Sequence, residues 1–205
     1  MKNAKIVVIS GPSGVGKGTV HTALRNGCAD YDFSVSVTTR APRDGEKEGV
    51  HYYYRTQDEF DRMIEEGRFA EYIRIYNNSY GTLKSELERI VNSGKHVVLD
   101  IEFEGGLNIK KAFPDAVLIY LLPPSLAELK ARIEHRGSET PETLNMRFGK
   151  AVAELEYAKL YDYVLVNDRV DECVNAINEI VTCEQRRSKD NLYLIESLKG
   201  GNRIC

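Results

Sequence analysis

The sequence predicts a three-layer α/β fold with a parallel sheet at its centre and a small inserted lobe. Short, nearly unbroken apolar runs rich in β-branched residues are typical of strands buried on both faces of a parallel sheet. Such runs span residues 6–10, 96–101, 117–122 and 162–167. Stretches with helical spacing lie between several of them, which favours helices on both faces of the sheet. The segment 34–95 has a different pattern and interrupts this alternation.

The first run is followed by a glycine-rich turn, GPSGVG at 11–16, and by a helix that we expect to begin near Lys17. Glycines let the backbone curl so that successive N–H groups point at phosphate oxygens, and the helix N-terminus adds its positive end. Lys17 would then reach the β and γ phosphates. An ordinary glycine-rich connection is the alternative, and such a pattern arises by chance in on the order of one chain in a hundred. The flanking strand and helix favour a nucleotide phosphate site.

Position 18 is a glycine where such loops commonly carry a Ser or Thr that binds magnesium. Two explanations stay open. The metal is held mainly by phosphates and water, which suits an ion that dehydrates reluctantly, or Thr19 takes the role from a shifted position. The variant GKGT is similar to the loop of adenylate kinases, and that resemblance points to nucleoside monophosphate kinases.

The segment 34–95 is predicted to form a lobe with its own small mixed sheet and an amphipathic helix within 57–69. Its stretch TTRAPRDGE places Arg40 and Arg43 three residues apart. This spacing could aim two planar guanidinium groups at one phosphate dianion. A solvated basic turn is the alternative, although several tyrosines nearby could complete the shell of a phosphate.

The second half of the chain returns to the alternating pattern. Asp100 ends the run 96–101, at the sheet edge where a ligand crevice is expected, and there it could orient a magnesium-bound water or Lys17. An ordinary strand-ending Asp is the alternative. Helical spacing covers 126–135 and 170–181, and an irregular stretch between them could close over the site. We therefore predict one domain, 1–205, divided into a core of 1–33 and 96–185, a lobe of 34–95, a lid of 135–147 and a tail of 186–205.

Composition narrows the possible functions. The 205 residues are 42% hydrophobic, enough for one domain with a buried core. The 28 basic and 31 acidic residues nearly balance, which argues against a sequence-blind nucleic-acid binder or a binder of anionic membranes. No apolar stretch suits a signal peptide or a membrane span. The four cysteines lack metal-ligand spacing, so we interpret them as free thiols and predict a cytoplasmic protein, either a monomer or a small homo-oligomer.

Ordered matches along the chain extend from the first strand to about Val181, and with them the sequence resembles the guanylate kinases. The matching stretches are GPSGVGK at 11–17, SVSVTTRAPRDGE at 34–46, GVHYYY at 49–54, FAEY at 69–72, SYGT at 79–82, LDIEFEG at 99–105, RIEHRGSE at 132–139 and YDYVLVND at 161–168. The resemblance implies a P-loop fold and transfer of the γ-phosphoryl group of ATP to GMP, and also to dGMP, with Mg²⁺. ATP and GMP are then the expected small-molecule partners.

The resemblance also implies roles for individual residues. The ATP-binding set is Gly11, Pro12, Ser13, Gly14, Val15, Gly16, Lys17, Gly18, Thr19 and Asn167. The GMP-binding set is Ser36, Arg40, Arg43, Tyr52, Glu71, Tyr80, Gly81, Thr82, Asp100 and Glu102. The catalytic set is Lys17, Arg132, Arg136 and Arg147, and Asp100 and Thr19 would contact the metal through water.

Guanine as the acceptor base makes chemical sense with this set. Guanine offers N1–H and a 2-amino group as donors, so a selective pocket needs carboxylate acceptors, here Glu71 and Glu102, with hydroxyls from Ser36 and Thr82. Adenine in the same place would leave the carboxylates without donors. Glu102 stands where the family often has Asp, which keeps the acceptor but changes the reach.

Two rival interpretations remain at this point. One is a guanylate-kinase-like scaffold module that binds phosphorylated peptides, but such modules typically have a degraded phosphate loop, and Lys17 and the arginines are present here. The other is a kinase for AMP or another monophosphate, against which the acceptor-rich pocket argues. The histidines at 21, 51, 96 and 135 have no partner at metal or triad spacing, and we assign them no chemistry.

Overall fold

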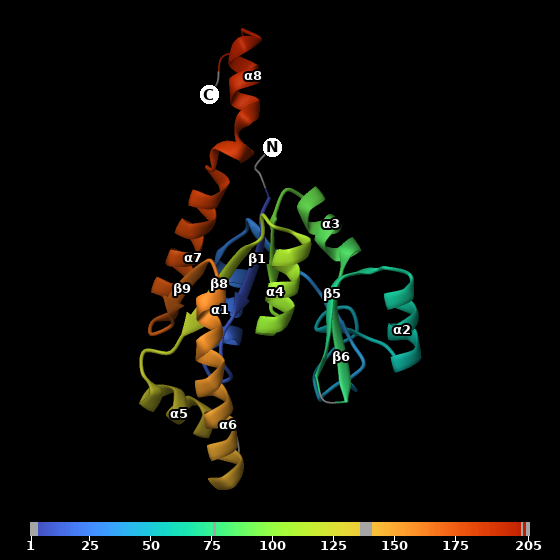
Figure 1. Cartoon of the computed structure of the whole chain (residues 1–205), viewed down its shortest axis with the longest axis vertical. Helices are drawn as coiled ribbons and strands as arrows, with labels where there is room; N and C mark the ends of the chain where they lie inside the picture. The colour runs from blue at the N-terminus through green and yellow to red at the C-terminus, as the bar shows by residue number, and fades with distance from the viewer. Residues whose placement is uncertain (1–3, 76, 136–140, 202, 204–205) are drawn as a thin grey trace.

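The computed structural model describes residues 4–75, 77–135, 141–201 and 203. Its centre is a five-stranded sheet in the order β2-β7-β1-β8-β9, in which all neighbouring strands are parallel (Figure 1). The strands are β1 (Ile6–Ser10), β2 (Tyr31–Phe33), β7 (His96–Leu99), β8 (Val117–Leu122) and β9 (Tyr163–Val166). The predicted α/β class and parallel core are confirmed, and β2 adds a strand that the apolar runs did not indicate.

Helices cover both faces of this sheet. Val7 and Ile9 of β1 pack with α1 (Lys17–Gly27) and α7 (Val170–Gln185) on one face. Val8, between them in the sequence, packs with α3 (Lys84–Asn92) and α4 (Phe103–Ala112) on the other. Because successive strand residues point to opposite faces, an unbroken apolar run is what a sheet buried on both sides requires. The three-layer prediction is confirmed.

The lobe has a second, mixed sheet in the order β4-β3-β6-β5. Its strands are β3 (Ser36–Thr38), β4 (Tyr52–Tyr54), β5 (Phe69–Ile75) and β6 (Asn78–Leu83). Phe60 and Met63 of α2 (Gln57–Glu65) pack with Val37, Phe69 and Leu83 in a separate small core. Thr56 and Glu59 form a capping box that begins α2. α3, by contrast, packs on the main sheet through Leu87 and Ile90.

Two further regions leave the body of the molecule. α5 (Leu126–Glu134) and α6 (Pro141–Glu154) pack through Leu129, Ile133 and Ala151. Of the lid predicted at 135–147, residues 136–140 lie outside the described part, and 141–147 are the first turns of α6 rather than irregular chain.

The tail contains η2 (Ser188–Asp190) and α8 (Leu192–Lys199). A six-residue 3-10 helix, η1 (Leu155–Leu160), links α6 to β9. Among the described helices, none is both long and apolar enough to cross a membrane.

Candidate active site

The glycine-rich turn lies between β1 and α1, at the carboxyl edge of the parallel sheet. Gly16 has φ 101°, and a Cβ there would lie 2.6 Å from Asn167 Nδ2. Asn167 Nδ2 donates a hydrogen bond of 2.9 Å to the carbonyl of Val15. The turn therefore needs glycine at position 16 for both its left-handed backbone and its close contact with Asn167, the residue after β9.

A hollow of about 600 Å³, here called the loop hollow, lies in front of this turn. Its lining is Pro12, Ser13, Gly14, Gly16, Lys17, Gly18, Arg43, Asp100, Glu102, Arg147, Lys150 and Glu154. Lys17 Nζ donates to the Gly11 carbonyl, with 2.5 Å between the two atoms. The hollow thus combines backbone N–H groups at a helix N-terminus with three or more cationic side chains, which suits a polyphosphate.

A second hollow of about 360 Å³, the lobe hollow, lies between the lobe and the main sheet. Its lining is Lys17, Ser36, Arg40, Arg43, Glu46, Tyr52, Glu71, Ile73, Ile75, Asn78, Tyr80, Gly81, Asp100, Ile101 and Glu102. The two hollows share Lys17, Arg43, Asp100 and Glu102. A group bound in one can therefore meet a group bound in the other.

Glu71 on β5 is an unusual group in the lobe hollow. Its side chain is buried, with the residue 6% exposed, and the hydroxyl of Thr82 donates to Oε1 at 2.7 Å. No protein group among the described residues pairs with Oε2. Burial raises the pKa of this carboxyl, and the two hydrogen bonds from Thr82 offset that effect only in part. A buried acceptor with a vacant oxygen is costly unless a ligand supplies a donor.

A third, smaller hollow of about 320 Å³ lies behind the turn. It is lined by Gly14, Gly16, Thr19, Arg132, His135, Asn167, Asp168 and Val170. Arg132 Nη1 donates to the carbonyls of Val15 and Asn167, at 3.3 and 3.1 Å, so it braces the turn from this side. Asn167 is 3% exposed, and its Oδ1 has no partner among the described residues.

Comparison with known proteins shows the family of the chain. The family model described as guanylate kinase matches residues 3–184. The chain is 47% identical over 190 residues to the guanylate kinase of Clostridium perfringens, covering 91% of this chain and 88% of that protein. It is 44% identical over 196 residues to the guanylate kinase of Caldanaerobacter subterraneus, covering 94% and 95%.

The chain belongs to the guanylate kinase family. The crystal structure of guanylate kinase from Anaplasma phagocytophilum superposes with a TM-score of 0.73 at 31% identity, covering 92% of this chain and 89% of that one. The expected fold and the expected transfer of phosphate from ATP to GMP are confirmed, and the protein is an ATP:GMP phosphotransferase. The matches cover nearly the full length of these guanylate kinases, so the scaffold and AMP kinase interpretations are set aside.

The structure brings most predicted residues of this guanylate kinase into the three hollows. Nine of the ten predicted GMP-binding residues line the lobe hollow, and Thr82 lies behind it against Glu71. Arg147 lines the loop hollow, whereas Arg132 and Thr19 line the third hollow, away from Asp100. Arg136 lies outside the described residues.

Glu46 is a site residue that the sequence analysis missed. Its carboxylate accepts from Arg40 Nη2 at 2.9 and 3.0 Å and from the Arg43 backbone N–H at 2.8 Å. It also accepts from the Tyr54 hydroxyl at 2.9 Å. The hydrogen bond from Arg40, followed by that from Arg43, lowers the pKa of Glu46 to about 2. The position of Glu46 three residues after Arg43 and six after Arg40 could have indicated this contact from the sequence.

His21 is a second residue that the analysis missed, and the assignment of no chemistry to it needs correction. It lies one helical turn after Lys17 on α1 and is 7% exposed. Its Nδ1 is 2.9 Å from Asp100 Oδ2. The Asp100 side chain is about half exposed, and its partial desolvation raises the pKa of the carboxyl, but the hydrogen bond and charge of His21 and the charge of Lys17 outweigh this and lower it. The i,i+4 spacing of Lys17 and His21 was the signal that could have found this contact.

Proposed function

We propose that GMP binds in the lobe hollow, with its base against Glu71 and its phosphate between Arg40 and Arg43, and that ATP places its phosphates in the loop hollow. The observation that carries this assignment is the vacant, buried Oε2 of Glu71. Guanine N1–H and its 2-amino group are donors that fit such an acceptor. Adenine presents an acceptor at N1 and would leave the carboxylate without a partner.

The other lining groups complete the fit for guanylate. Ser36 supplies a hydroxyl and Glu102 a second carboxylate at the base end of the hollow. Thr82 holds Glu71 by its hydrogen bond instead of touching the ligand directly. At the phosphate end, Tyr52 and Tyr80 have their rings 6.2 Å apart, and the guanidinium of Arg40 lies 5.4 Å from the centre of the Tyr52 ring.

The shared residues explain how phosphoryl transfer would proceed. Arg43 lines both hollows and can contact the acceptor phosphate and the group that is being transferred. Lys17 exchanges the Gly11 carbonyl for phosphate oxygens, and Arg147 adds charge from α6. Phosphoryl transfer asks mainly for alignment and for positive charge on the moving oxygens. Arg132 braces the turn, and a role of Arg136 in the transfer stays a prediction.

Magnesium fits the donor set of the loop hollow. Among the described residues, no group of three or more His, Cys, Asp or Glu side chains could hold a metal alone. Mg²⁺ typically keeps several waters and binds one or two carboxylates together with substrate phosphates. Asp100, whose side chain is 52% exposed and lies beside Gly18, would accept from a metal-bound water. The ion would neutralise phosphate charge. This arrangement needs no hydroxyl at position 18, and Thr19 lies in the other hollow.

The third hollow is proposed to take the adenine end of ATP. Asn167 lines this hollow, and its buried Oδ1, which has no partner among the described residues, would accept from the amino group of adenine. The cytoplasmic location, the use of dGMP, the oligomeric state and the division into core, lobe and lid stay predictions.

The assignment is tested by measuring GMP and AMP binding by isothermal titration calorimetry. Replacing Glu71 by Gln removes the charged acceptor, so GMP affinity should fall by about 10- to 100-fold, the value of hydrogen bonds to a charged group. Glu104→Gln is the matched control, because Glu104 is exposed on α4 and does not line the lobe hollow. Equal GMP affinities for the wild type and Glu71→Gln would contradict the assignment.

A further inference from the structure

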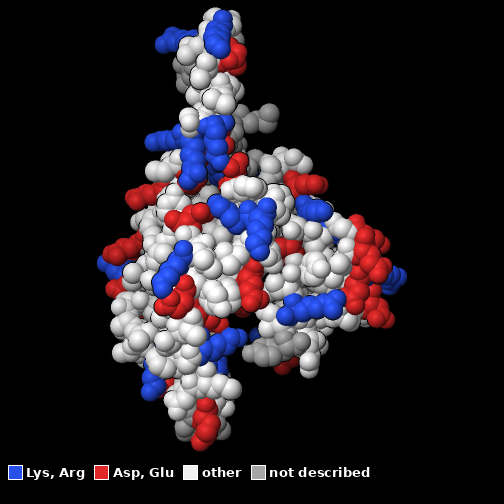
Figure 2. All heavy atoms as spheres, viewed as in Figure 1, with Lys and Arg blue, Asp and Glu red and all other residues white. Residues whose placement is uncertain are grey.

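The C-terminal helix α8 carries apolar side chains that no part of the described protein covers. Leu192, Tyr193, Ile195 and Leu198 are 50% to 59% exposed, and no residue of α8 is buried. Figure 1 shows this helix extending away from the body beyond α7. Figure 2 shows uncharged atoms over most of its length and charged groups towards its tip. A short helix with several exposed large apolar side chains indicates an interaction surface.

The base of α8 is fastened to the body. Lys5, which is 5% exposed, pairs with Asp190 at 2.5 Å, immediately before the helix. Asn191 Nδ2 donates to the carbonyls of Gln185 and Arg187 at 2.8 and 2.9 Å. Lys189 pairs with Asp115. These contacts hold the start of α8 at the surface, and one residue, Asn191, separates Asp190 from the helix.

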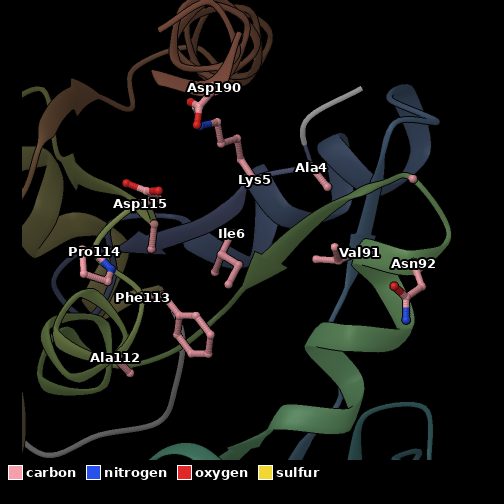
Figure 3. Close-up of a pocket in the computed structure, with 12 residues that line it drawn as sticks. Ala4, Lys5, Ile6, Val91, Asn92, Ala112, Phe113, Pro114, Asp115 and Asp190 are labelled. Carbon is pink, nitrogen blue, oxygen red and sulfur yellow. Dashed lines mark hydrogen bonds and ion pairs between the residues drawn. The ribbon is translucent and has the colours of Figure 1, made fainter. Parts of the chain in front are cut away.

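A hollow of about 700 Å³, the root hollow, opens beside this base. Lys5 and Asp190 form one wall, and Ile6, Val91 and Phe113 supply much of the apolar lining (Figure 3). The hollow lies where β1, β7 and β8 begin, at the opposite edge of the sheet from the glycine-rich turn. It is therefore separate from the substrate site. The chain thus carries an apolar helix and, at the root of that helix, an apolar hollow.

We propose that two copies of the chain associate through antiparallel α8 helices, each placing its tip in the root hollow of the other. A helix of eight residues is about 12 Å long. Antiparallel pairing therefore brings Leu198 of one copy to the root of the other copy's helix, where the hollow opens. The contact uses the same surfaces on both copies and closes with two-fold symmetry.

The chemistry of α8 favours a second copy over a lipid surface. Helices that lie on membranes are typically rich in Lys and Arg on their polar face. The charged residues of α8 are Glu196 and Lys199, which pair with each other at 3.0 Å. The paired helices and the two root hollows that receive their tips would bury on the order of 1,000 Å² in total, which is at the lower end for specific interfaces. We expect a dissociation constant in the micromolar range, within the concentrations tested below.

Sedimentation velocity of the full chain between 1 and 100 μM, without nucleotides, tests this proposal. The wild type should pass from monomer to dimer over this range. Leu198→Asp should stay monomeric, and Val91→Asp, in the wall of the root hollow, should weaken association at least tenfold. Leu160→Asp is the matched control, because Leu160 is 57% exposed on η1 and should leave the dimer unchanged. ADP release from ATP and GMP, equal in all four proteins, shows that each is folded.

Each alternative outcome has a definite meaning. A wild type that remains monomeric at 100 μM overturns the proposal, and co-sedimentation of that monomer with anionic lipid vesicles would assign α8 to a membrane instead. A dimer that survives Leu198→Asp overturns the role of α8. A dimer that is lost with Leu198→Asp but unaffected by Val91→Asp would show that the tip of α8 does not bind in the root hollow.

Discussion

Single carboxylates hold the binding groups of the lobe hollow in place before substrate arrives. Glu46 gathers Arg40, the backbone of Arg43 and the hydroxyl of Tyr54 around one side chain. Glu71, another carboxylate of this hollow, is itself held by the hydrogen bond from the Thr82 hydroxyl. The charge-assisted hydrogen bonds to Glu46 orient the Arg40 guanidinium, which a phosphate would otherwise have to order on binding, and they fix the backbone at Arg43.

The contribution of Glu46 to stability should depend on pH. Its pKa lies near 2 in the folded protein, below the ordinary value of 4.5. The stabilisation is therefore full above about pH 4.5 and is lost as the pH falls towards 2. Calorimetric melting of wild type and Glu46→Gln should show a difference in Tm at pH 7 that shrinks through this range. Glu104→Gln is the control, and a difference that is the same at every pH would contradict the account.

His21 should act on the reaction through Asp100. Removing the imidazole in His21→Ala frees the Asp100 carboxylate to turn towards Lys17, so kcat should fall by about tenfold, as for other partners that orient site carboxylates. His21 does not line the lobe hollow, although Asp100 does, so the KM for GMP should change less than kcat. His21→Gln keeps a donor and should recover most of the rate, whereas His51→Ala should have no effect. A raised KM with normal kcat would assign His21 to substrate binding instead.

At the scale of elements, the glycine-rich turn and α1 place different demands on neighbouring glycines. Gly16 has φ 101° and touches Asn167, whereas a Cβ at Gly18 would meet nothing within 4 Å. Gly16→Ala should therefore destabilise the protein by at least about 1–2 kcal/mol, the cost of a left-handed backbone. Gly18→Ala should stabilise it, by up to about 1 kcal/mol, because alanine favours a helix. Urea unfolding of both variants checks this contrast, and equal losses would contradict it.

The sequence revealed some elements and concealed others for physical reasons. Strands β1, β7, β8 and β9 could be predicted because burial on both faces leaves an unbroken apolar run. α4 was not predicted, since Gly105 and Gly106 weaken its helical signal. A Cβ at Gly105 would lie 2.9 Å from Glu71 Oε2, and one at Gly106 would lie 2.4 Å from the Tyr161 hydroxyl. Both positions require glycine because other elements pack closely against them, and this packing cannot be seen in the local sequence.

At the scale of the whole molecule, the site is assembled from the core, the lobe and α6. Motif residues such as Lys17, Arg40 and Glu71 could be named from the sequence because the family resemblance covers them. Glu46 and His21 could not, because their importance lies in side-chain contacts that depend on the folded arrangement. Lys150 and Glu154 of α6 also line the loop hollow, and Glu154 accepts from the Ser13 N–H at 3.2 Å.

The lobe and the region around α5 and α6 should close over both nucleotides. Water must be excluded during transfer, since ATP would otherwise be hydrolysed. Small-angle scattering should show a smaller radius of gyration when a bisubstrate analogue, adenosine joined to guanosine through phosphates, is added. ADP alone, which leaves the lobe hollow empty, should give a smaller change. The absence of any compaction with the analogue would rule out closure.

The most direct test of the account is a coupled ADP-release assay with ATP, Mg²⁺ and either GMP or AMP. If guanine binds in the lobe hollow as proposed, kcat/KM for GMP should exceed that for AMP by at least about 10³-fold. Lys17→Ala should abolish the GMP-dependent release while GMP still binds. Comparable turnover with AMP, or GMP binding without turnover in the wild type, would contradict the account.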